Sequence, residues 1–92
     1  MKISELTEII RQRITTKPEK SYITQLVASG EDRVLQKVFE EAGEAVIALK
    51  NEDRQEQVSE LSDLFFHILI AMEIKGIKLT DIEAELERRH KN

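Results

Sequence analysis

The sequence predicts an all-α protein, a small bundle of about five helices, and three observations favour this class. Apolar residues make up 40% of the 92 residues and charged residues 35%, whereas aromatic residues make up only 4%. This composition suits amphipathic helices better than a β-sandwich. Apolar residues also recur at three- and four-residue spacing. Only three glycines and one proline interrupt the chain, so residues 1–92 are expected to form a single all-α domain.

The first two helices are predicted before Gly30. The first runs from about Ile3 to Ile14 and ends before Pro18, which disfavours helical geometry at the preceding residue. Ser21 is a suitable N-cap for a short second helix, which Gly30 is well placed to end. The apolar residues of the first helix recur with helical spacing: Ile3, Leu6, Ile10 and Ile14.

The third and fourth helices are longer and are expected to pack as an antiparallel hairpin. The third begins at Glu31 or Asp32 and lasts to about Lys50, and residues 51–53 form the turn. Its expected core-facing stripe consists of Leu35, Val38, Phe39, Ala42, Val46 and Leu49. The fourth runs from about Arg54 to Lys75, and Gly76 ends it. This helix is the most apolar, so we expect it to be central.

A last helix is predicted from Asp81 to about Arg89. Thr80 and Glu83 form a capping box at its start, and basic residues lie at its C-terminal end. A chain of this size buries only a thin core, and it has no cysteine to form a disulfide or a thiolate metal site. Oligomerisation is the remaining common support for so small a domain.

Four acidic residues on the hairpin are the candidate functional residues. Glu41 and Glu44 are one helical turn apart, as are Glu60 and Asp63, and the pairs lie level when counted from the turn. Four converging carboxylates need a cation, and oxygen ligands suit Mg²⁺ or Mn²⁺. Asp63 lies among apolar neighbours, where an unpaired buried charge is costly. The alternative is that these acids lie on solvated helix faces.

Other residues are weaker candidates. Glu40 is either a further ligand, the base that activates water, or an exposed residue. His67 is either an orienting partner of a carboxylate or a core histidine. A phosphate held by the metal would be in reach of Lys37, with Arg33, Lys50 and Arg54 less favoured than a solvated position. Ser21 and Tyr22 either pack locally or contact the sugar or base of a nucleotide.

Charge and motifs exclude several function classes. The net charge of −4 argues against broad binding to nucleic acid or anionic membranes. The N-terminal residues are charged and no segment approaches transmembrane length, so we expect a cytoplasmic protein. The common phosphate-binding loops, the zinc motif HExxH and the calcium loop are absent from the sequence.

The acidic pattern, ExxE at 41–44 and ExxD at 60–63, resembles the metal-binding signature of the all-α, MazG-like nucleoside triphosphate pyrophosphohydrolases. Within that superfamily, the segments SY, GEDR, KVFEEAGE and DLFFH are similar to the phosphoribosyl-ATP pyrophosphohydrolases of histidine biosynthesis. The similarity extends from about Ile3 to Arg89. Departures from the family pattern include Phe39 in place of glycine and Gln36 in place of lysine.

The resemblance implies a homodimer that binds Mg²⁺ through Glu41, Glu44, Glu60 and Asp63, with catalytic carboxylates at 40, 41 and 44. The implied reaction converts phosphoribosyl-ATP to phosphoribosyl-AMP and pyrophosphate. Two alternatives stay open at this stage. One is a house-cleaning hydrolase of other nucleoside triphosphates that uses the same acids, and the other is a non-catalytic helical dimerisation module.

Overall fold

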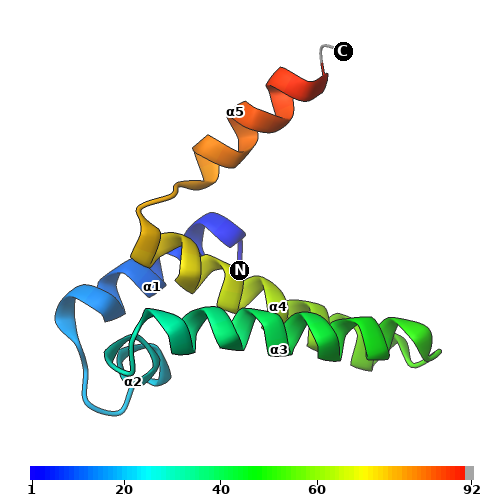
Figure 1. Ribbon diagram of the computed structural model, residues 1–92, viewed down its shortest axis with the longest axis horizontal. Coiled ribbons are helices and arrows are strands. Elements are labelled where there is room, and N and C mark those ends of the chain that lie inside the picture. Colours follow the sequence, from blue (N-terminus) through cyan, green and yellow to red (C-terminus); the bar gives the residue numbers. More distant parts are fainter. Residues whose placement is uncertain (91–92) are drawn as a thin grey trace.

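The computed structural model describes residues 1–90 and contains five α-helices, with no strand in that range. Figure 1 shows them in chain order. Their bounds are α1 (Ile3–Thr16), α2 (Tyr22–Ala28), α3 (Glu31–Lys50), α4 (Arg54–Lys75) and α5 (Leu79–His90). The predicted all-α class is therefore confirmed. The final two residues of the predicted domain lie outside the described part. No helix within residues 1–90 is long and apolar enough to cross a membrane.

The helix ends follow local chemistry. The Ser21 hydroxyl accepts a hydrogen bond from the Thr24 N–H at 3.3 Å. Ser21 is therefore the N-cap of α2, as predicted. Gly76 ends α4 in the left-handed conformation, with φ at +71°, as its position predicts. Helix α1 continues two residues past the predicted Ile14, and Lys17 ends it in the left-handed conformation immediately before Pro18.

The start of α5 differs from the prediction. Thr80 is not the cap, because the helix already begins at Leu79. The Asp81 carboxylate accepts a hydrogen bond from the Lys78 N–H at 2.8 Å. In a capping box, the side chain of the third helical residue accepts a hydrogen bond from the N-cap N–H, as Asp81 does here from Lys78. The observed pair, Lys78 and Asp81, lies two residues before the predicted pair, Thr80 and Glu83. The helix also ends at His90, one residue past the predicted end.

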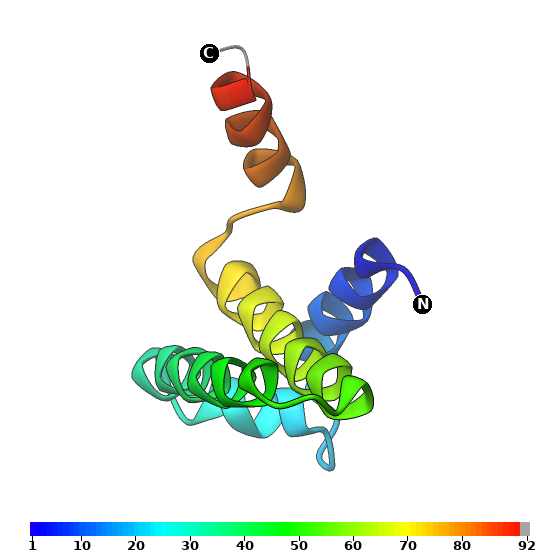
Figure 2. The same ribbon diagram turned by 90° about the vertical axis from the view of Figure 1, so that its right-hand side faces the viewer.

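Four helices share the hydrophobic core. Helix α4 packs against α3 and also against α1, while α2 packs against α1 and α3. Figures 1 and 2 show α3 and α4 leaving their connecting turn side by side, with α1 and α2 at the opposite end of the hairpin. The buried apolar residues gather at that opposite end: Ile10, Ile23, Leu26, Val34, Leu69 and Ile70. Nearer the turn, the small buried side chains Ala45 and Ala48 let α3 and α4 approach closely.

The predicted core stripe of α3 is wrong for most of its members. Leu35, Phe39, Val46 and Leu49 are 43% to 83% exposed. The buried residues of α3 lie on the adjacent strip: Val34, Glu41, Ala45 and Ala48. Two neighbouring strips of this helix carry apolar residues at heptad-like spacing, and packing against α4 selects the strip with the smaller side chains. The outer strip carries the larger apolar side chains, and for this reason the sequence pattern predicted that it faces the core.

Beyond its first residue, Leu79, which packs against the core, helix α5 stands apart from the other four. Figures 1 and 2 show it projecting from the end of α4 into open space. None of its residues is buried, and its apolar residues Ile82 and Leu86 are 44% and 58% exposed. The chain therefore has a packed body, α1–α4, and an extended terminal helix.

Candidate functional site

The hairpin brings three carboxylates together between the core and the turn. Glu41 of α3 and Glu60 and Asp63 of α4 each offer an oxygen, and these three oxygens lie within 4.8 Å of one another. One helical turn separates Glu60 from Asp63, so both project from the same side of α4. The antiparallel pairing of the two helices brings Glu41 level with them. We refer to Glu41, Glu60 and Asp63 as the acidic cluster.

Glu44 borders the acidic cluster but is not one of its three members. Hydrogen bonding to the Glu41 carboxyl and the charge of Glu41 raise the pKa of Glu44, and the charge of Glu60 adds to this effect. The same hydrogen bond to Glu44 lowers the pKa of Glu41, against the effect of burial, and the Lys37 ammonium lowers it further. The carboxyls of Glu41 and Glu44, one turn apart on α3, thus influence each other's protonation.

Glu41 is the buried member of the cluster. Its side chain is only 9% exposed, and its Oε2 atom has no hydrogen-bond partner within the described residues. Burial of an unpartnered carboxylate oxygen is costly unless a cation or a donor satisfies it. The other oxygens of the cluster are also hard, anionic donors of the type that Mg²⁺ and Mn²⁺ prefer. The donor set and the orphaned oxygen both fit a divalent cation.

The expected burial of Asp63 is wrong. Its side chain is exposed, although its sequence neighbours Leu64 and Phe66 are at least partly buried. Helix α4 carries apolar residues on most of its circumference, and Asp63 occupies the polar gap that opens beside α3. The buried acid is instead Glu41. Its neighbours in the sequence are no more apolar than those of Asp63, so the sequence did not indicate which of the two acids is buried.

Lys37 is the basic residue nearest the acidic cluster. Its Nζ lies 3.4 Å from Oε1 of Glu41 and 3.5 Å from Oε2 of Glu40. Burial by itself lowers the pKa of Lys37, but the charge of Glu41 and the hydrogen bonds to Glu41 and Glu40 outweigh it and raise this pKa. Lys37 is therefore held in its charged form beside the carboxylates.

Glu40 lies on the exposed side of this group. Besides Lys37, it accepts a hydrogen bond from Gln36 at 3.1 Å and faces Arg33 at 3.5 Å. Two of the predicted phosphate-binding residues, Arg33 and Lys37, therefore share Glu40 as an ion-pair partner. Lys50 is at the last position of α3, next to the turn, and takes part in no ion pair within residues 1–90.

Tyr22 and His67 connect α2 to the site. The Tyr22 hydroxyl oxygen lies 2.7 Å from Nε2 of His67, and Nδ1 of His67 lies 2.7 Å from the Asp63 main-chain oxygen. The same Nδ1 lies 4.0 Å from Oε1 of Glu41. His67 is buried, so it is both a core histidine and a neighbour of the carboxylates. The 45-residue separation of Tyr22 and His67 left no sequence signal for their contact.

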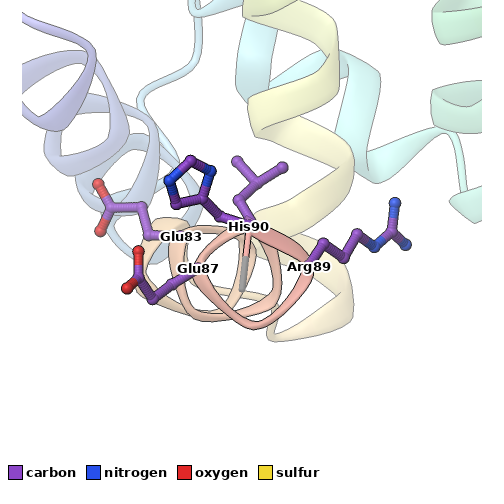
Figure 3. Close-up of a pocket in the computed structure, with 5 residues that line it drawn as sticks. Glu83, Glu87, Arg89 and His90 are labelled. Atoms are coloured by element: carbon purple, nitrogen blue, oxygen red, sulfur yellow. The ribbon is translucent and has the colours of Figure 1, made fainter. Parts of the chain in front are cut away.

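Ser21 has a structural position at the start of α2. Its hydroxyl serves as the helix cap, and the residue is buried. The hollow in Figure 3 is remote from this chemistry. It is lined by Glu83, Leu86, Glu87, Arg89 and His90, all from α5, and no second element faces them. A surface with one wall cannot enclose a small ligand, so the acidic cluster is the candidate site.

Comparison with known proteins identifies the family of this chain. Residues 3–90 match the family model of phosphoribosyl-ATP pyrophosphohydrolase. The chain is 48% identical over 86 residues to the phosphoribosyl-ATP pyrophosphatase of Leptospira biflexa, and the match covers 94% of each chain. It is 47% identical over 87 residues to the enzyme of that name from Clostridium botulinum, covering 95% of this chain and 79% of that protein.

A longer relative contains a similar region. The histidine biosynthesis bifunctional protein HisIE of Oceanobacillus iheyensis is 47% identical over 88 residues, which are 96% of this chain and 41% of that protein. The family match spans all five helices and includes the acidic cluster, Lys37, Tyr22 and His67. The chain therefore belongs to the phosphoribosyl-ATP pyrophosphohydrolase family.

Proposed function

We propose that this protein hydrolyses phosphoribosyl-ATP to phosphoribosyl-AMP and pyrophosphate, in histidine biosynthesis, with the help of a divalent cation. The observation that carries this proposal is the acidic cluster, in which a buried carboxylate oxygen of Glu41 lacks a partner. The names of the relatives supply the substrate. The reaction adds water across the anhydride between the α and β phosphates.

Glu41, Glu60 and Asp63 would hold Mg²⁺, or Mn²⁺ in its place, and Glu44 is the adjacent fourth carboxylate. The bound ion would supply neutralisation of phosphate charge in the transition state. Lys37, charged and only partly exposed, binds a phosphate oxygen of the substrate. Glu40 or Glu44 accepts the proton of the attacking water. Arg33, Lys50, Tyr22 and the start of α2 at Ser21 complete the proposed substrate surface.

The first test is release of pyrophosphate from phosphoribosyl-ATP with Mg²⁺ and with the ion removed by a chelator. We expect release only with the ion, restored by adding Mg²⁺ back. Release that is equally fast with the chelator would contradict the metal role. A panel of ordinary and modified nucleoside triphosphates tests the substrate, and faster turnover of any of these would replace phosphoribosyl-ATP in the proposal.

We also propose that the protein acts as a homodimer. Five apolar residues of α3 form an outer apolar face: Leu35, Phe39, Val46, Ile47 and Leu49. The chain exposes 6922 Å², whereas a compact monomer of 10.7 kDa exposes about 5,500 Å². The excess of about 1,400 Å², part of which lies on the projecting helix α5, is of the size that a stable dimer covers on each partner. A cytoplasmic location is part of the same proposal.

Phe39→Glu tests the dimer, because it places a charge at the most exposed residue of the outer apolar face. Light scattering should give the mass of two chains for the unaltered protein and of one chain for this variant. Gln12→Glu, which adds a charge to the exposed side of α1, is the matched control and should remain dimeric. A monomeric unaltered protein would contradict the proposal.

A further inference from the structure

The contact between Tyr22 and His67 has a fixed direction. The Asp63 main-chain oxygen can only accept a hydrogen bond, so Nδ1 of His67, 2.7 Å away, carries the hydrogen. In the neutral ring the other nitrogen, Nε2, is then a bare acceptor. The Tyr22 hydroxyl lies 2.7 Å from Nε2, so it donates its only hydrogen to His67. The Tyr22 oxygen keeps its lone pairs for other partners and has no hydrogen left to give.

The surroundings keep this arrangement in place. His67 is only 5% exposed, so its ring cannot turn freely. Phe66 packs edge-on against His67 at 5.2 Å between ring centres and stacks on Tyr22 at 6.1 Å. Tyr22 itself is 46% exposed, so its ring also faces the space outside the core. The buried histidine thus orients a tyrosine that a ligand can reach.

This oriented hydroxyl lies beside the phosphate end of the proposed site. His67 lies between this hydroxyl and the carboxylate of Glu41: its Nε2 is 2.7 Å from the Tyr22 oxygen, and its Nδ1 is 4.0 Å from Glu41 Oε1. An acceptor oxygen repels a phosphate oxygen but binds a hydrogen-bond donor. In a nucleotide, the group bonded to the phosphates is a sugar, and the donors of a sugar are its hydroxyls.

We propose that His67 is a positioning residue, which holds the Tyr22 hydroxyl as an acceptor for a ribose hydroxyl of the substrate. This inference rests on the proposed function for the identity of the ligand, but the orientation of Tyr22 belongs to the protein alone. His67 acts through Tyr22 and touches no reacting atom. Its part is to discriminate a sugar hydroxyl from a phosphate oxygen at this position.

The orientation is tested without metal or substrate. The chain has two histidines, so the variant His90→Gln leaves His67 as the single imidazole for nitrogen NMR. We expect Nδ1 to be protonated and Nε2 to be bare. Adding Tyr22→Phe should shift the Nε2 resonance further towards that of a free acceptor and leave Nδ1 in place. A protonated Nε2, or no response to Tyr22→Phe, would overturn the proposal.

The role in binding is tested by kinetics on phosphoribosyl-ATP. Tyr22→Phe should raise KM by about three- to tenfold, the range for loss of one neutral hydrogen bond, with a smaller effect on kcat. His67→Leu should raise KM equally, and the double variant no further, because His67 acts through Tyr22. His67→Gln, which restores a side-chain acceptor, should recover KM. Additive effects, or no recovery despite intact helicity, would contradict the role.

The sugar contact is tested with analogues of phosphoribosyl-ATP that each lack one ribose hydroxyl. One of them should lose about three- to tenfold in kcat/KM with the unaltered protein and nothing further with Tyr22→Phe. Equal losses in both proteins for every analogue would overturn the sugar assignment. Absence of any turnover by the unaltered protein would instead refute the proposed function, while the NMR result on His67 would keep its meaning.

Discussion

The two long sides of α3 differ in a way that reverses the usual distribution of residues. The side facing α4 buries a carboxylate, Glu41, between small residues such as Ala45 and Ala48. The outward side exposes large apolar residues, with Phe39 83% and Ile47 66% exposed. Charge is costly inside a protein and apolar surface is costly outside it. We therefore propose that a divalent cation binds on the side that buries Glu41, and that a second copy of the chain covers the exposed apolar side.

The largest expected effect concerns the acidic side. Asp63→Asn keeps the shape of the side chain but removes its charge, so we expect turnover of phosphoribosyl-ATP to fall by at least about 100-fold. Loss of a residue that only orients a metal ligand already costs 10- to 100-fold. Circular dichroism should show unchanged helicity. Asp32→Asn, in the exposed first turn of α3, is the matched control, and an equal loss there would show that the effect is not specific to the cluster.

Two isoleucine variants distinguish the contribution of core packing to stability from that of the outward side of α3. Ile70 is fully buried, so Ile70→Ala should lower the free energy of unfolding by about 2–5 kcal/mol at every protein concentration. Ile47→Ala should lower it only at concentrations where the dimer is populated, because dilution leaves this side chain in water. Urea unfolding at several concentrations measures both. A concentration-independent loss for Ile47→Ala would contradict the assignment of its face to a second copy.

The smallest effect concerns the ion itself. Magnesium at ten times its Kd should raise the free energy of unfolding of the unaltered protein by about 1.4 kcal/mol. Glu41→Gln should gain much less from Mg²⁺, because it removes the carboxylate charge that would bind the ion. Glu85→Gln on α5 serves as the control. Equal stabilisation of Glu41→Gln by Mg²⁺ would exclude Glu41 as a ligand.

The helices were predictable because their signals are local. Gly76, Ser21 and the spacing of apolar residues placed the ends of α2, α3 and α4 close to their observed positions. The level of the acids along the hairpin was also predictable, since it follows from the rise per residue and a short turn. The start of α5 was missed because Thr80 is a good N-cap residue by type, whereas the helix begins after Lys78 and Asp81 accepts the hydrogen bond from the Lys78 N–H.

By itself, the sequence determined five helices, a hairpin and acids at matching heights, because helix formation depends on neighbours in the chain. Only the tertiary structure decided which strip of α3 faces α4, that Glu41 and not Asp63 is buried, and that Tyr22 meets His67. These features depend on how helices rotate about their axes when they pack. That rotation is set by the fit between side chains that are distant in sequence, so the periodicity of a single helix does not predict it.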